Sequence, residues 1–361
     1  MLSLPIRSVL LCAALFAAAA CSESNNATNP GGGGDTTGTG KDTLGCRSTD
    51  PDSGVTVGTV VTDSFASTSL GVLKHYLVYL PPSYAKSTQR KYPVAYYLHG
   101  TEATERSWID QMQLATTLDT LAVKAKTPEM IVVMPDGDDS FWHNWDRTPD
   151  YQTCLNNVGP IGYCVQTANY GDYVASDLVR HIDSTYRTLT DSVHRGVAGL
   201  SMGGAGAIYL ALAYPKVFGA AAALSPAILT WLNVGGPPDG VMASDTSQIH
   251  TFLGPEWDDY KIYDQFNANL STWALSDPYS MAVARAGAGT PFPPIWISVG
   301  TDDGEALVGS QIFHNKLTHL GIAHTYIEVP GAAHTVDFWT THAGAASAWL
   351  QGQLNPCPRA N

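Results

Sequence analysis

Short apolar runs recur along the chain, separated by segments whose apolar positions return every three or four residues. The apolar runs are typical of buried parallel strands: Tyr92–Leu98, Met130–Met134, Val193–Ala198, Phe218–Leu224, Ile295–Val299 and Tyr326–Val329. The remaining segments favour helices: Tyr173–Tyr186, Gly204–Leu212 and Gln311–Leu320. Strands that alternate with helices in this way predict an α/β fold with a mostly parallel central sheet and helices on both faces.

Two further segments depart from this alternation. Val55–Val61 and Leu73–Leu80 have β-like patterns close together, and we expect antiparallel strands that open the sheet. Between residues 225 and 290 neither period holds, because aromatic residues mix with glycine and proline. This insertion is either a cap near the functional site or a helical excursion packed on the core.

The motif Gly199–Gly204 joins a predicted strand to a helix rich in small residues. Its G-x-S-x-G pattern is that of a nucleophile elbow, the sharp turn that raises a serine above the sheet of an α/β-hydrolase. The turn is strained, and glycines on both sides of Ser201 avoid collisions with neighbouring backbone. We therefore predict that Ser201 is a catalytic nucleophile.

A serine nucleophile needs a base, and the base needs a third group that orients it. In this fold the acid and then the histidine follow the serine, each after a strand. Asp303 follows Ile295–Val299 and His334 follows Tyr326–Val329, so we assign them as acid and base. Asp302 is the alternative acid, and one of the two aspartates is expected to cap the next helix. The other histidines of this half are less well placed: His314, His319, His324 and His342.

The predicted reaction also needs two backbone N–H groups that bind a developing oxyanion. One belongs to the residue after the nucleophile, Met202, and the other to a loop after an earlier strand, where Thr101 is the candidate. The His99 side chain is expected to brace this loop. Three tryptophans are candidates for stacking on a sugar or phenolic ring, although they fit the core equally well: Trp108, Trp142 and Trp231.

No metal or other cofactor is predicted. Asp136–Ser140 resembles part of a calcium loop, but Phe141 stands where that loop needs glycine and Arg147 where it needs glutamate. A polar turn is the better interpretation. The chain also has no H-E-x-x-H motif, which argues against catalytic zinc.

The first 45 residues predict export. Residues 1–20 have the basic start and apolar run of a signal peptide, and Ala18–Cys21 resembles a lipoprotein cleavage box in which Cys21 is lipidated. A secreted protein cut near Ala20 is the alternative. Residues 21–45 are expected to be a flexible linker, and residues 46–358 the folded domain. We thus predict secretion or anchoring at the cell surface or outer membrane, with membrane contact only through the lipid.

The remaining cysteines and the charge add two expectations. Four cysteines in an exported domain suggest two disulfides, with three pairings possible. We favour Cys154–Cys164, a local loop, and Cys46–Cys357, which would join the ends of the domain. The formal net charge of −13 argues against nucleic acid as a partner.

Several of these motifs occur together and in order in one known family: Val78–Pro82, Tyr97–Gly100 with Trp108, Met134–Gly137, Ala198–Gly204, Leu224–Pro226 and Pro330–His334. The chain resembles the esterase D-like branch of the α/β-hydrolases. This branch includes carbohydrate esterase family 1 feruloyl and acetylxylan esterases, S-formylglutathione hydrolases and antigen 85 mycolyltransferases. The resemblance implies an α/β-hydrolase fold and an acyl-enzyme on Ser201, and Asp303 matches the family's Gly-x-x-Asp pattern.

The resemblance leaves the reaction partners open. Thr101–Glu105 replaces the glycine-rich loop of many members, and the insertion at 225–290 carries no substrate signature. Export favours extracellular esters such as those of plant cell-wall polysaccharides, so a serine carbohydrate esterase of feruloyl or acetylxylan type is the first hypothesis. An acyltransferase with the same triad and a non-catalytic surface-binding lipoprotein are the alternatives.

Overall fold

The computed structural model describes residues 54–124, 127–146, 148, 150–156, 164–228 and 269–354. These residues all belong to one compact unit, residues 42–361. Several predictions lie outside the described residues and stay predictions: the signal peptide, the linker, Cys21, Cys46, Cys357, Trp231 and the part of the insertion between 229 and 268.

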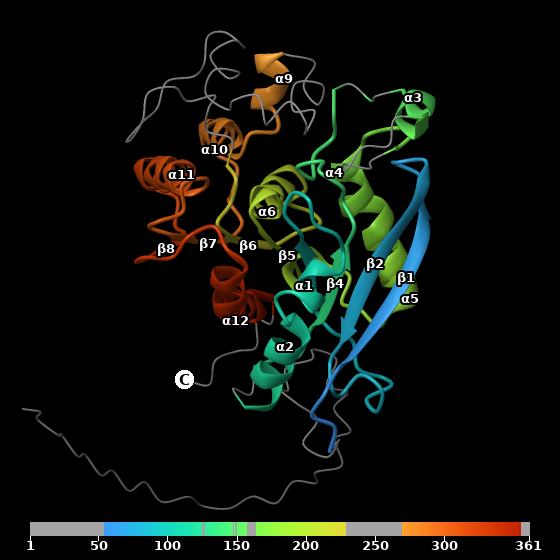
Figure 1. The fold of residues 1–361 in the computed structure, drawn as a ribbon. Coiled ribbons are helices and arrows are strands. Elements are labelled where there is room, and N and C mark those ends of the chain that lie inside the picture. The colour runs from blue at the N-terminus through green and yellow to red at the C-terminus, as the bar shows by residue number, and fades with distance from the viewer. Residues whose placement is uncertain are drawn as a thin grey trace, which may run out of the picture. The chain divides into compact units, whose positions relative to one another are not determined.

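The described residues form an eight-stranded sheet with the order β1-β2-β4-β3-β5-β6-β7-β8 (Figure 1). The strands are β1 Thr59–Ser67, β2 Val72–Leu80, β3 Val94–Leu98, β4 Ile131–Pro135, β5 Arg195–Leu200, β6 Ala220–Leu224, β7 Ile295–Gly300 and β8 Thr325–Val329. Strands β3 to β8 run parallel, whereas β2 pairs antiparallel with both β1 and β4. The predicted mostly parallel α/β sheet is confirmed.

Helices cover both faces of the sheet (Figure 1). On one face lie α1 Ser107–Asp110, α2 Leu114–Val123 and α12 Val336–Leu354. On the other lie α4 Tyr170–Asp172, the π-helical η1 Tyr173–Leu178, α5 Val179–Thr185, α6 Met202–Ala213, α10 Pro278–Gly287 and α11 Leu307–His319. Shorter elements are α3 Tyr151–Asn156, η2 Ser192–His194 and α9 Leu270–Ala274. Burial on both faces explains why the central strands are mostly apolar.

The first strand differs from its prediction. The chain enters β1 at Thr59 rather than Val55, and β1 pairs with β2 from Thr59 opposite Leu80 to Ser67 opposite Val72. The strand lies at the sheet edge and most of its side chains are exposed, so polar residues such as Asp63 fit within it. An edge strand has one strand neighbour and buries little, which weakens the apolar pattern on which the prediction relied.

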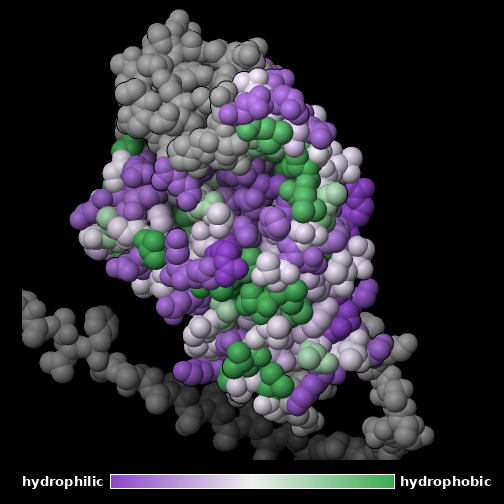
Figure 2. Space-filling model, turned by 45° about the vertical axis from the view of Figure 1, so that its right-hand side comes forward, coloured by the Kyte–Doolittle hydropathy of each residue, from purple (hydrophilic) through white to green (hydrophobic). Residues whose placement is uncertain are grey.

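The disulfide predicted between Cys154 and Cys164 is present, with a Cα–Cα distance of 5.4 Å. It joins α3 to the segment that leads into α4. On the face of the molecule that Figure 2 shows, apolar side chains lie in separate groups among polar ones. Within the described ranges, no helix has both the length and the apolar character needed to cross a membrane.

Candidate active site

Ser201 occupies a strained turn between β5 and α6. Its φ of 52° and ψ of −121° are unfavourable for a residue with a side chain. Close backbone packing surrounds the turn: a Cβ at Gly199 would lie 2.1 Å from the carbonyl oxygen of Gly203, and a Cβ at Gly203 would lie 2.3 Å from that of Leu98. The elbow therefore depends on glycine at both positions, as the motif predicts.

Two loops bring Asp303 and His334 to Ser201. Nε2 of His334 lies 2.9 Å from the Ser201 hydroxyl, and Nδ1 of His334 lies 2.9 Å from Oδ2 of Asp303. An ionised carboxylate only accepts hydrogen bonds, so Nδ1 donates to Asp303 and Nε2 is free to accept from the serine hydroxyl. Burial opposes the charge on Asp303, but the hydrogen bonds that the carboxylate accepts, first that from His334, act together with the charge of His334 to hold the pKa of this carboxyl below its usual range.

The structure separates the two adjacent aspartates. Asp303 is 1% exposed and faces His334, whereas Asp302 is exposed and its carboxylate accepts the hydroxyl of Thr301. Asp303 also accepts the backbone N–H of Ala306 at 2.8 Å. One aspartate thus both contacts the histidine and anchors the turn before α11.

The two predicted oxyanion N–H groups belong to Thr101 and Met202, on loops that meet at Ser201. A Cβ at Gly100 would lie 3.3 Å from Cβ of Ser201, which places the Gly100–Thr101 peptide beside the serine. Met202 is the first residue of α6, where a backbone N–H has no carbonyl partner within its helix. Across the described residues, the hydrogen bonds include none donated by either N–H group.

The His99 side chain braces the loop after β3. Its Nδ1 lies 2.7 Å from the carbonyl oxygen of Gly100 and must donate to it, and its Nε2 accepts the backbone N–H of Gly137 at 3.0 Å. These two partners make Nδ1 the donor of the ring and Nε2 its acceptor. His99 therefore joins the backbone of the loop after β3, at Gly100, to that of the turn after β4, at Gly137.

Two tryptophans proposed as stacking residues belong to the core instead. Trp108 and Trp142 are both 0% exposed, so neither offers a ring face to a ligand. Trp108 packs edge-on against Tyr97, and Trp142 donates from Nε1 to the carbonyl oxygen of His99 at 3.2 Å. Aromatic residue type alone does not distinguish packing from ligand binding, which is why the sequence left both readings open.

Two residues near the triad were not identified from the sequence. The half-buried Trp339 sets its ring perpendicular to that of His334, with centroids 4.9 Å apart. The exposed Glu305 places Oε2 3.7 Å from Nε2 of His334. Glu305 follows Asp303 and Trp339 follows His334 by a few positions, and this closeness in sequence was the only feature of the chain that could have identified them.

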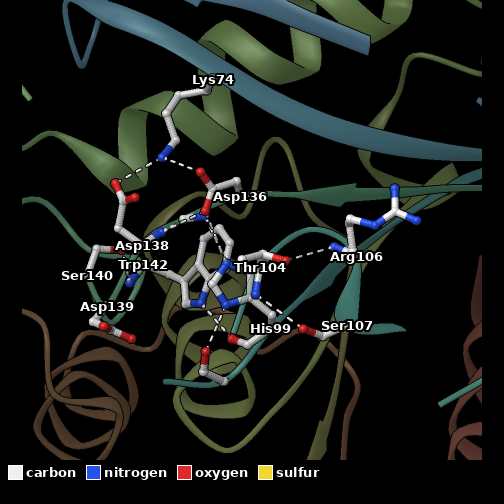
Figure 3. A network of polar contacts seen from close by, with 12 residues as sticks. Lys74, His99, Thr104, Arg106, Ser107, Asp136, Asp138, Asp139, Ser140 and Trp142 are labelled. Atoms are coloured by element: carbon white, nitrogen blue, oxygen red, sulfur yellow. Dashed lines mark hydrogen bonds and ion pairs between the residues drawn. The ribbon is translucent and has the colours of Figure 1, made fainter. Parts of the chain in front are cut away.

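The polar turn after β4 binds a buried lysine through two of its carboxylates. Nζ of Lys74 lies 2.7 Å from Asp136 and 2.9 Å from Asp138, and Lys74 is 5% exposed (Figure 3). Burial alone would lower the pKa of Lys74, but the two carboxylates raise it, so the ammonium stays charged. In the ranges that the structure describes, no group of three or more potential ligand side chains is arranged to hold a metal ion.

A family model supplies the decisive comparison. The Esterase family, described as "Putative esterase", matches residues 67–350, well over half of the chain. The chain belongs to this family. The predicted resemblance to the esterase D-like branch and the α/β-hydrolase fold are both confirmed.

Individual relatives of this esterase-family chain are distant. Esterase Rv1288 of Mycobacterium tuberculosis is 25% identical over 278 residues, which are 74% of this chain and 54% of that protein. The endo-1,4-beta-xylanase/feruloyl esterase of Xylanibacter ruminicola is 32% identical over 159 residues, 43% of this chain and 20% of that protein. The chain therefore spans about half of the first relative and a fifth of the second.

A solved S-formylglutathione hydrolase from Agrobacterium tumefaciens shares the fold. It matches with a TM-score of 0.62 at 19% identity, over 82% of this chain and 96% of that chain.

Proposed function

We propose that this protein hydrolyses carboxylic esters through an acyl-enzyme on Ser201. The observation that carries the proposal is the continuous chain of contacts from the Ser201 hydroxyl through His334 to the buried Asp303, each 2.9 Å long. Membership of the Esterase family supports the same reaction. A serine on a strained elbow with an oriented base is the arrangement that acyl transfer requires.

In the first half of the reaction, Nε2 of His334 accepts the proton of Ser201 while Oγ attacks the ester carbonyl carbon. The carbonyl oxygen takes the electron pair and is held by the N–H groups of Thr101 and Met202. The bond to the alcohol oxygen then breaks, the alcohol leaves with the proton from His334, and an ester remains on Ser201. Asp303 stabilises the imidazolium that forms in between.

In the second half, water replaces the alcohol. His334 accepts a proton from water as its oxygen attacks the acyl-enzyme, and returns that proton to Oγ of Ser201 as the acid leaves. An acyltransferase differs only at this step, because a second alcohol takes the place of water.

For the substrate we propose extracellular carbohydrate esters of the feruloyl or acetylxylan type. The predicted export of the chain supports an extracellular ester. A relative with 32% identity over its matched segment carries feruloyl esterase and xylanase in its name. The predicted lipid anchor at Cys21 would hold the enzyme at the surface where cell-wall fragments arrive.

The test compares the wild-type chain with Ser201→Ala and with Ser184→Ala, an exposed serine on α5 that serves as the control. Substrates are p-nitrophenyl acetate, methyl ferulate and acetylated xylan. We expect turnover by the wild type and the control and loss of turnover in Ser201→Ala. Equal turnover by all three would contradict the proposal. Product that forms only when an acceptor alcohol is added would assign acyl transfer instead.

A further inference from the structure

We propose that Asp139 is a positioning residue for the oxyanion site. It holds the peptide that follows Thr101, so that the Thr101 N–H stays directed at the carbonyl oxygen of the ester. This inference rests on the proposed function, because it assigns Asp139 a role in the reaction at Ser201. Asp139 lies in a different loop from the residues that would contact the substrate.

The contact between the two loops is short and buried. Oδ1 of Asp139 accepts the backbone N–H of Glu102 at 2.7 Å across 37 positions in the sequence, and Asp139 is 5% exposed. Glu102 has a φ of +56°, a left-handed conformation that is unfavourable for a residue with a side chain. Such a conformation persists only where surrounding contacts impose it, and the carboxylate of Asp139 is a contact of that kind.

Two hydrogen bonds bracket the Thr101 N–H. In a planar trans peptide the C=O and N–H point in opposite directions. The bond from His99 to the carbonyl oxygen of Gly100 therefore sets the direction of the N–H of Thr101 in the same peptide unit. Asp139 fixes the next unit through the N–H of Glu102. With both neighbouring units held, rotation of the Thr101 N–H away from Ser201 would break one of these bonds.

The loop that carries Asp139 is itself fixed. Lys74 binds the carboxylates of Asp136 and Asp138, and Gly137 donates its N–H to His99, as Figure 3 shows for Lys74 and the two aspartates. Three residues of this loop have positive φ angles, namely Asp138, Phe141 and Trp142, with values of 49°, 55° and 62°. Strain of this kind at the base of a functional loop is typical of a preorganised site. The loop thus presents Asp139 in a defined place.

The experiment measures kcat and KM for p-nitrophenyl acetate with Asp139→Ala and Asp139→Asn in the full chain. It also measures inhibition by a trifluoromethyl ketone, which forms a tetrahedral adduct with the serine hydroxyl. Asp177→Ala is the matched control: Asp177 is 7% exposed and accepts the backbone N–H of Ser69 at 2.7 Å, but it is not part of the proposed oxyanion site. All assays are run below the unfolding transition of every variant.

We expect Asp139→Ala to lower kcat about 10-fold or more, because a correctly placed oxyanion donor stabilises the transition state more than the bound substrate and its displacement removes that difference. KM should stay nearly constant, and the ketone should bind more weakly by a similar factor. Asp139→Asn keeps an acceptor oxygen for Glu102 and should restore most of kcat. Asp177→Ala should lower thermal stability with kcat retained.

Two results would overturn the inference while the proposed function stands: unchanged kcat in Asp139→Ala, or an equal loss of kcat in the Asp177→Ala control. A rise in KM with unchanged kcat is a case of the first result, because the position of the oxyanion donor acts on the chemical step. Failure of the wild type to turn over any ester would instead contradict the proposed function, and this inference with it.

Discussion

Asp277, the N-cap of α10, gives the sharpest prediction for the stability of the scaffold around α6. It is 2% exposed, and Oδ2 accepts the backbone N–H of Ser280 at 2.8 Å. Among the described residues, Oδ1 has no hydrogen-bond partner. Burial raises the pKa of this carboxyl to about 6, although hydrogen bonds from Ser280 oppose the shift. The ionised form is therefore unfavourable in the folded protein.

The expected magnitude follows from the difference between the folded and unfolded pKa. The folded value of about 6 exceeds the ordinary value of 3.8 by roughly 2 units, which corresponds to about 3 kcal/mol. Between these two values the unfolded chain loses its proton while the folded chain keeps it. Rising pH therefore lowers stability across this window, and the full cost persists above the folded pKa.

Asp277→Asn removes the charge and keeps an oxygen for the Ser280 N–H. Its buried amide N–H₂ would take the place of Oδ1, which in the neutral acid also lacks a hydrogen-bond partner among the described residues, so the variant should match the neutral acid in stability and gain up to about 3 kcal/mol over the ionised form near pH 7.5. Near pH 4, just above the ordinary value of 3.8, the gain should shrink to about 0.5 kcal/mol. Urea unfolding at both pH values measures the difference, with the exposed Asp110→Asn as the control. An equal effect at both pH values, or lower stability near pH 7.5, would refute the reasoning.

Three further substitutions test the site and its scaffold. Asp303→Asn presents an amide N–H₂ to Nδ1 of His334 and favours the wrong tautomer of the histidine, so kcat/KM should fall about 10³- to 10⁴-fold. Asp302→Asn is the control and should leave kcat/KM nearly unchanged. Similar losses in both variants would contradict the assignment of Asp303 as the acid. Gly203→Ala places a methyl group 2.3 Å from a backbone oxygen at the end of β3. The free energy of unfolding, measured with urea, should therefore fall by about 3 kcal/mol. An unchanged urea midpoint would contradict the close packing around Gly203. Joint replacement of Cys154 and Cys164 by Ser opens a loop with a sequence separation of 10. The free energy of unfolding should fall by about 2–3 kcal/mol, and kcat should be retained. An unchanged urea unfolding curve would contradict a stabilising role for this disulfide.

The sequence predicted the parts of the fold that are apolar throughout or sharply patterned. The runs that became β3 to β7 lie buried between two helical layers, and the glycines around Ser201 mark a turn where no side chain fits. Asp303 and His334 were found because both follow parallel strands, whose C-terminal ends meet at one edge of the sheet. Their contact with Ser201 was not visible in the chain itself.

The remaining features depend on tertiary contacts. The edge strand β1 was misplaced because its exposed side chains carry little apolar signal. Trp108 and Trp142 were proposed as stacking residues, but neighbouring elements bury both. Lys74 offered a missed signal: a lysine in a strand that is apolar apart from it and His75 indicates a buried partner, here the turn at Asp136 and Asp138.

Trapping an acyl group on Ser201 tests the central claim most directly. The full chain is mixed with p-nitrophenyl acetate, quenched in acid during the first turnovers, digested and examined by mass spectrometry. We predict an acetyl group on the peptide that contains Ser201 in the wild type, and none on that peptide in Ser201→Ala. Turnover of the ester without acetylation of Ser201, or the same acetylated peptide in Ser201→Ala, would contradict an acyl-enzyme at this residue.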